Sequence, residues 1–152
     1  MEETSVFEKF ELHLDQSAKD FLKETAKWAY FLSILGFVGV ALFIVIAIFA
    51  GAIFASMGNS MPGMGVFAGS FGAIMSFFYL LIAAVYFFPV YYLFKFSSNA
   101  KRAFRDNDSE ELTSALGYLK SHYKFIGILM VSMLVLYALF FLLAITGALL
   151  GR

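Results

Sequence analysis

Three methionines lie close together at a spacing that suits metal chemistry. Met57, Met61 and Met64 fall within a stretch rich in Gly and Ser, and clustered thioether sulfurs are soft ligands suited to Cu(I). The chain contains seven Met in all, however, and Met also fills gaps between helices and forms flexible surfaces. We therefore favour a loop without metal and expect no cofactor. The copper site is a hypothesis that a cuprous titration tests.

The other reactive groups do not form a catalytic set. The sequence has no Cys and only two His, His13 and His122, both in charged stretches. Hydroxyls in the apolar stretches, such as those of Ser76 and Ser132, have no neighbouring residue that could act as a base. We expect no enzymatic activity, and we expect His122 to be a solvated interfacial residue and not a ligand.

Long uncharged runs determine the class of protein. Apolar residues make up 61% and charged residues 14% of the 152 residues, against about 45–50% and 25% in soluble domains. No Asp, Glu, Lys or Arg occurs in residues 28–94 or 125–151. A helix needs about 20 apolar residues to cross a bilayer. We predict an all-α integral membrane protein with three transmembrane helices and an amphipathic helical cytoplasmic extension, in a single membrane domain (1–152).

The segments of this domain follow from the charges and the helix breakers. Asp15 or Ser17 can cap a first helix, and Asp108 with Glu111 has the spacing of a second cap. The apolar stripes of the cytoplasmic helices are expected to pack as a small bundle, or otherwise to lie on the lipid surface. The expected segments are a tail (1–14), a cytoplasmic helix plus the first span (15–55), an external loop containing Pro62 (56–70), the second span plus an extension (71–105), and a cytoplasmic helix plus the third span (109–150).

Positive charges near the span ends predict the orientation. Cytoplasmic flanks of membrane proteins are enriched in Lys and Arg. Nine such residues lie close before the first span or between the second and third, whereas the opposite side has only Arg152. We expect a cytoplasmic N-terminus and an external C-terminus. The nine residues are Lys19, Lys23, Lys27, Lys95, Lys101, Arg102, Arg105, Lys120 and Lys124.

Aromatic and basic residues meet where the second span ends. Tyrosine rings are typical of membrane interfaces, and basic residues beyond them attract anionic headgroups. Pro89, inside this span, removes the usual donor to the carbonyl of Val85, so we expect a kink there. Headgroup contact is expected from Tyr91, Tyr92, Lys95, Lys101, Arg102 and Arg105.

Small residues are spaced for close packing of helices. Rows of Gly, Ala and Ser let membrane helices approach closely. They could close the bundle within one chain or a contact between chains, and the sequence leaves both open. The residues are Gly39, Ala47, Gly51 and Ala55 in the first span, Gly72, Ser76 and Ala84 in the second, and Gly147 in the third.

Three stretches at the span boundaries resemble a known family. They are ETAKWAYFLSILGFVG (24–39), YFFPVYYLFKFSSNAKRA (86–103) and LGYLKSHYKFIGI (116–128). Together they resemble a family of small bacterial inner-membrane proteins known only as a domain of unknown function. The resemblance implies a bacterial inner (cytoplasmic) membrane location and supplies no activity or functional residue.

These observations predict a class of function. We expect a non-catalytic interaction or scaffold subunit whose partners are the lipid bilayer and either a second copy or another membrane protein. The alternative is a small oligomeric channel or an accessory subunit of a transporter. A channel would have to be oligomeric, because three helices are too few to enclose a wide channel. A formal net charge of zero provides no basic field, so no nucleic-acid partner is expected.

Overall fold

Three long α-helices make up the computed structural model, which describes residues 15–60, 63 and 65–150. They are α2 (Gln16–Ser60), α3 (Gly65–Asp106) and α4 (Ser109–Leu150). Each is long and apolar enough to cross a membrane, because a helix rises about 1.5 Å per residue and the hydrocarbon core is about 30 Å thick. The prediction of an all-helical chain with three apolar helices is confirmed, and these helices indicate a multi-pass membrane protein. The expected tail lies outside the described residues.

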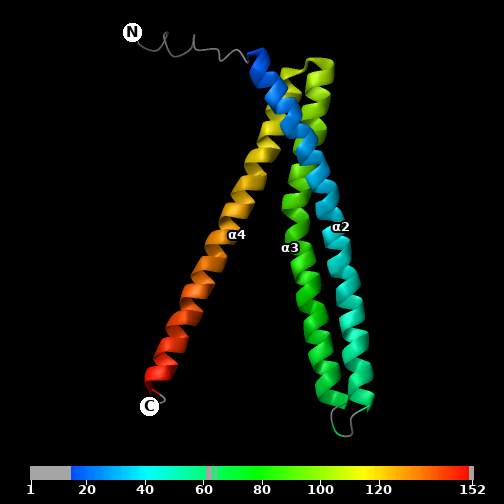
Figure 1. The fold of residues 1–152 in the computed structure, drawn as a ribbon, viewed down its shortest axis with the longest axis vertical. Helices are drawn as coiled ribbons and strands as arrows, with labels where there is room; N and C mark the ends of the chain where they lie inside the picture. The colour runs from blue at the N-terminus through cyan, green and yellow to red at the C-terminus, as the bar shows by residue number, and fades with distance from the viewer. Residues whose placement is uncertain (1–14, 61–62, 64, 151–152) are drawn as a thin grey trace.

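The first two helices, α2 and α3, form a long antiparallel hairpin (Figure 1). Aromatic pairs along its length fix the register between the two helices, with ring centroids about 5–6 Å apart. The pairs are Tyr30 with Phe94 at 5.8 Å, Phe43 with Tyr86 at 6.1 Å, and Phe54 with Phe71 at 5.0 Å. The turns of α2 before residue 28 therefore lie beside the turns of α3 after residue 94.

The connection between α2 and α3 differs from the loop expected over residues 56–70. Both helices extend into this stretch. A Cβ atom on Gly58 would lie 2.7 Å from that of Ala68, so the two helices are in very close contact here. This packing outweighs the weak helix propensity of Gly and Ser. Between the helices, Gly63 has a φ of 87°, which Gly adopts without strain.

The connection between α3 and α4 is a tight, capped turn. Asn107 adopts the left-handed conformation with a φ of 52°, and the N–H of Asp108 donates to the carbonyl of Ala103 at 3.0 Å, as at many helix ends. Asp108 also caps α4, because its Oδ1 accepts from the N–H groups of Glu110 and Glu111 at 2.8 and 3.2 Å. The charge-rich segment therefore reverses the chain within two residues.

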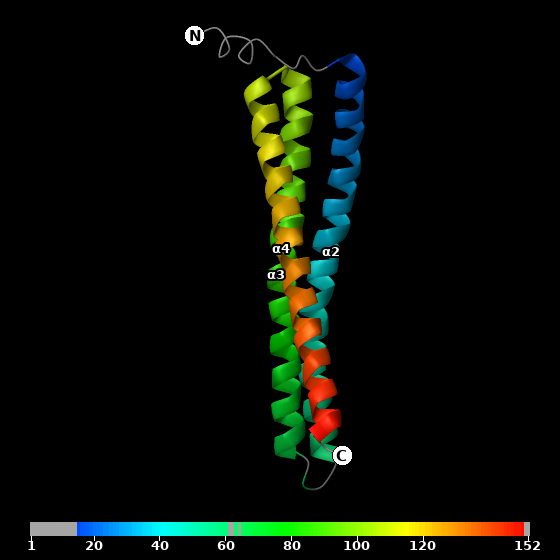
Figure 2. The ribbon, with the colours of Figure 1, turned by 90° about the vertical axis from the view of Figure 1, so that its left-hand side faces the viewer.

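The last helix, α4, stands apart from the hairpin over most of its length. It packs on α3 near its start and then diverges, and within the described part of the chain no Cα atom of α4 lies within 8 Å of a Cα atom of α2 (Figures 1 and 2). Residues 130–148 are all exposed. Because hydrocarbon solvates apolar side chains as well as a neighbouring helix does, apolar composition alone does not draw membrane helices together.

Candidate functional site

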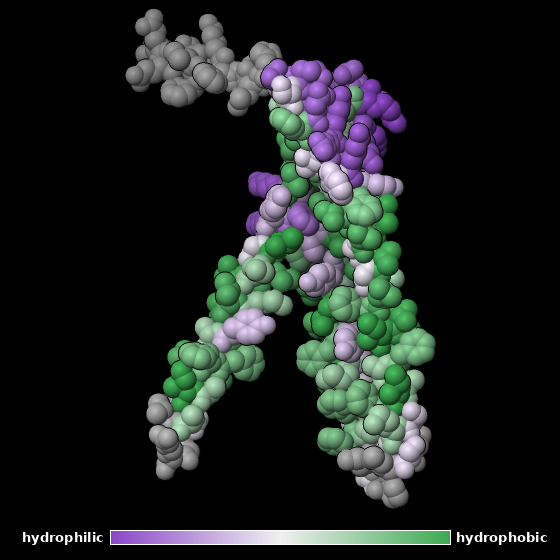
Figure 3. All heavy atoms as spheres, viewed as in Figure 1, coloured by the Kyte–Doolittle hydropathy of each residue, from purple (hydrophilic) through white to green (hydrophobic). Residues whose placement is uncertain are grey.

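Hydrophilic residues gather at the end of the molecule where α2 begins, α3 ends and α4 begins (Figure 3). We call this part the charged end. A small core ties the three helices together there, and its alanines allow a close approach. The buried residues of this core are Ala26 and Ala29 of α2, Phe96 and Ala100 of α3, and Ala115 of α4.

Two serine hydroxyls are fully buried near this core. Ser33 donates to the carbonyl of Tyr30 at 2.7 Å, and Ser97 donates to the carbonyl of Phe94 at 2.8 Å. Each bond lies within one helix and satisfies a hydroxyl that would otherwise be costly to bury. These serines fill space, and no base in hydrogen-bonding contact activates either one among the described residues.

A cleft of about 370 Å³ opens between α2 and α3 at the charged end. Four of its six lining residues are cationic and the other two are apolar. The hairpin register brings them together, because it places the first turns of α2 beside the last turns of α3. The lining residues are Lys23, Ala26 and Lys27 of α2 with Lys101, Phe104 and Arg105 of α3.

Aromatic rings hold two of the ammonium groups in this basic cleft. The Nζ of Lys101 lies 3.6 Å from the ring centroid of Tyr30, and the Nζ of Lys23 lies 5.7 Å from that of Phe104. Both contacts cross between α2 and α3. A cation–π contact positions an ammonium group without neutralising its charge, so the positive charge stays available to an anion.

Two arginines at this end pair with carboxylates, and one of them, Arg105, also lines the basic cleft. Arg102 on α3 donates to Glu111 on α4 and so joins the two helices. Arg105 donates to Asp106 from Nε at 2.8 Å and from a terminal nitrogen at 3.0 Å. These hydrogen bonds lower the pKa of Asp106 and raise that of Arg105. The pair is exposed, and such pairs are weak and screened by salt.

The residues expected to contact headgroups lie in different surroundings in the structure. Lys101 and Arg105 line the basic cleft, whereas Arg102 is engaged with α4. Lys95, which directly follows the uncharged stretch, lies over the ring of Tyr91 at 5.7 Å. Tyr91 and Tyr92 are both half-buried.

The two cleft lysines of α2 were not predicted from the sequence as site residues. Lys23 and Lys27 are four residues apart, which places them on one face of a helix. That spacing was the available signal. The register of the hairpin determines which residues of α3 this face meets. The charge pattern alone does not reveal that register.

Four of the small residues expected to pack helices meet at the α2–α3 contact. Ser76 donates to the carbonyl of Ala47, which is almost fully buried, at 2.6 Å. A Cβ on Gly51 would lie 2.9 Å from Ser76 Oγ, and a Cβ on Gly72 would lie 2.8 Å from that of Phe54. The backbones therefore approach as closely as these residues allow.

The other four small residues do not take part in this contact. Apart from the adjacent backbone of its own helix, no described atom lies within 4 Å of a Cβ built on Gly39 or Gly147, and Ala55 and Ala84 are exposed. Gly36 was not predicted as a packing residue, although a Cβ there would lie 2.6 Å from the side chain of Val90. Its only signal was its residue type.

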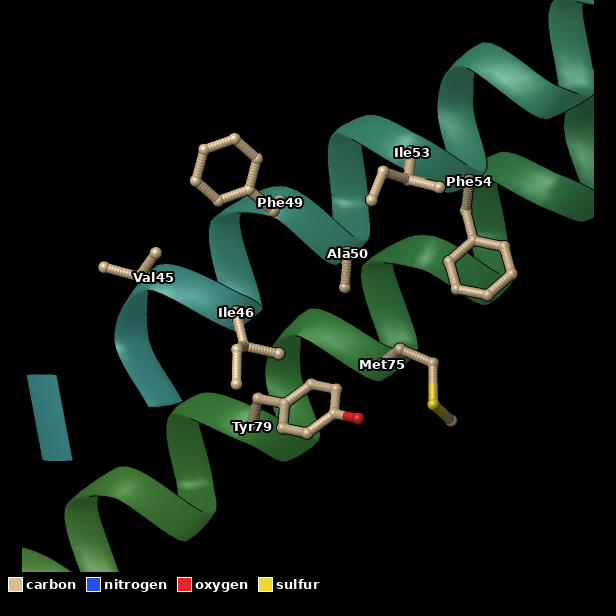
Figure 4. Close-up of a pocket in the computed structure, with 8 residues that line it drawn as sticks. All are labelled: Val45, Ile46, Phe49, Ala50, Ile53, Phe54, Met75 and Tyr79. Atoms are coloured by element: carbon tan, nitrogen blue, oxygen red, sulfur yellow. The ribbon is translucent and has the colours of Figure 1, made fainter. Parts of the chain in front are cut away.

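An apolar groove of about 430 Å³ runs along α2 and α3 within the uncharged stretch. Figure 4 shows Met75 and Tyr79 of α3 along one side and aliphatic and aromatic residues of α2 along the other. The groove has no acidic or basic lining residue. It suits an acyl chain or an apolar helix. The α2 residues that line it are Val45, Ile46, Phe49, Ala50, Ile53 and Phe54.

One histidine joins α4 to α3 near the point where the helices diverge. His122 Nδ1 lies 2.8 Å from the carbonyl oxygen of Pro89. A carbonyl only accepts, so Nδ1 carries the proton. The ring of Phe125 lies 6.0 Å from that of Phe88. His122 is thus half-buried and hydrogen-bonded, which differs from the solvated residue expected. The helix α3 continues through Pro89.

The expected copper ligands are only partly described. Met57 is 51% exposed on the last turns of α2, whereas Met61 and Met64 lie outside the described residues. Within the described part of the chain, no group of three or more His, Cys, Asp or Glu side chains could hold a metal ion.

Comparison with known proteins identifies a family and no characterised relative. The model of a family of unknown function (DUF5362) matches residues 54–145, which is more than half of the chain. No curated protein and no solved structure matches. The matched residues cover the end of α2, the whole of α3 and most of α4.

Proposed function

Because the chain belongs to the DUF5362 family of unknown function, whose description assigns no activity, we propose its function from the geometry. The proposal is a non-catalytic membrane protein that acts as an interaction or scaffold subunit. Its charged end holds the three helices together, and its apolar helices present surfaces to other molecules in the membrane.

The divergence of α4 from the hairpin is the observation that supports this proposal most. Large apolar side chains such as Leu139, Phe140 and Leu143 are 52–68% exposed on α4. A helix that serves only to complete the bundle would pack along its whole length. We propose that a membrane helix of another protein, or of a second copy, packs against α4 in the open side of the hairpin.

A photoreactive amino acid placed on α4 tests the proposal. At position 139 it should yield a protein adduct of defined mass in native membranes, whereas at position 47, which is buried against α3, it should yield only links within the chain. Labelling of lipid alone from position 139, and from the neighbouring turns at 135 and 143, would argue against a protein partner. Light scattering in detergent then distinguishes a second copy from a different protein.

The location belongs to the same proposal. We propose the bacterial inner membrane, with the charged end in the cytoplasm, on the support of the nine basic residues that flank the spans on that side. In the described chain, α2 begins and α4 ends at opposite ends of the molecule (Figure 1). Tags at the two ends of the chain should therefore report from opposite compartments, and tags found in one compartment would contradict this topology.

A further inference from the structure

We propose that the basic cleft between α2 and α3 binds the phosphate group of an anionic lipid headgroup. This site is more specific than a general attraction of the charged end to the membrane, because it uses side chains from two helices in one cleft. It rests on the membrane placement of the helices and does not depend on the scaffold role.

The charge of the cleft is the first argument. Its lining contains four cations and no carboxylate. Among the ion pairs between described residues, none involves Lys27 or Lys101. Arg105 is paired with Asp106 at 2.8 Å, and the partner of Lys23 is Asp20, at a loose 3.9 Å and on an exposed surface. Lys27 and Lys101 therefore leave a positive charge that a phosphate group can neutralise.

The depth of the cleft is the second argument. Lys27 immediately precedes the uncharged run of α2. The backbone of Lys101 lies about 10 Å beyond the uncharged run of α3. Its ammonium group, however, lies over the ring of Tyr30. That ring pairs with the ring of Phe94, at the end of the uncharged run. The headgroup layer is about 5–8 Å thick on each side, so both ammonium groups lie at the level of lipid phosphates.

The apolar part of the lining is the third argument. Ala26 and Phe104 line the same cleft as the four cations. A lipid presents a phosphate next to glycerol and acyl carbons, so a cleft with both cationic and apolar groups fits it better than it fits free phosphate. Lysine and arginine near the surface attract anionic lipid, and here an aromatic ring holds the ammonium group of Lys101 in position.

The experiment follows binding of short-chain phosphatidylglycerol to the full chain in neutral detergent. The single tryptophan, Trp28, is exposed and lines a neighbouring pocket together with Lys23 and Lys27 of the cleft, so its fluorescence reports on binding at these lysines. K27Q/K101Q should weaken binding about 25-fold, because each basic residue contributes about fivefold. K27R/K101R keeps the charges and should retain binding within about threefold, provided that circular dichroism shows the parent helix content.

The matched control is K120Q/K124Q. It removes the same charge from exposed residues of α4 outside the cleft and should change the affinity less than twofold. Equal losses in the two glutamine variants would mean diffuse attraction and would overturn the proposal, as would full binding by K27Q/K101Q. Phosphatidylcholine should not bind. Inorganic phosphate that competes at the concentration of the lipid would overturn the assignment to a headgroup.

Discussion

Replacing Gly72 with alanine (G72A) should loosen the hairpin at its closest approach. The new Cβ would lie 2.8 Å from the Cβ of Phe54 and 3.3 Å from the carbonyl oxygen of Gly51. Neither atom is the end of a flexible side chain, so the helices must separate by about 0.6 Å to restore an ordinary contact in a close-packed interface. Overpacking of this kind costs about 1–3 kcal/mol. We expect the unfolding equilibrium constant of G72A to be about 5- to 150-fold above that of an alanine variant at an open glycine, which gains the same helix propensity without the overpacking.

The assay is reversible unfolding of the full chain in mixed micelles with a denaturing detergent, followed by circular dichroism. G39A is the matched control, because the space around Gly39 is open to 4 Å within the described residues and alanine favours a helix over glycine by about 1 kcal/mol. G39A should be at least as stable as the parent. A G72A variant that matches G39A in stability would refute the close approach of α2 and α3.

Three further predictions concern hydrogen bonds. S76A removes the donor to Ala47 and should cost about 0.6 kcal/mol in the same unfolding assay; unchanged stability would mean that the bond contributes nothing. D108A removes the cap of α4 and should cost about 1 kcal/mol, with faster amide exchange in its first turn, whereas D108N should retain protection. The hydrogen bonds from Arg105 lower the pKa of Asp106. Any stability that this carboxylate contributes is therefore fully present above the ordinary carboxyl pKa of about 4. It is lost as the pH falls through the lowered pKa. R105Q should raise the NMR titration midpoint of Asp106 towards the ordinary range, and an unchanged midpoint would exclude Arg105 as the cause.

The helices were predictable because their signals are local. Uncharged runs mark the apolar parts of α2, α3 and α4 directly in the sequence. The cap at Asp108 follows from its spacing to Glu111, and the structure contains it. The boundary between α2 and α3 was harder, because Gly58 is poor at forming helices on its own and is helical through its contact with Ala68.

The site was less predictable because it depends on contacts between helices. Lys27 and Lys101 are 74 positions apart, and only the register of the hairpin brings them to one cleft. Gly36 and Gly39 look alike in the sequence, yet only the first meets a neighbouring side chain in the described structure. Nothing in the apolar run of α4 indicates that it would leave the hairpin, since its composition matches that of a packed span.

The contacts of His122 with Pro89 and of Phe125 with Phe88 fix α4 to α3 beside the charged end. Beyond this point α4 extends about 35 Å to residue 148. A rotation of only 10° about this point would move the far end of α4 by about 6 Å, roughly the rise of one helical turn. A small rearrangement at the charged end, on one side of the bilayer, would thus cause a larger displacement of the end of α4 on the other side.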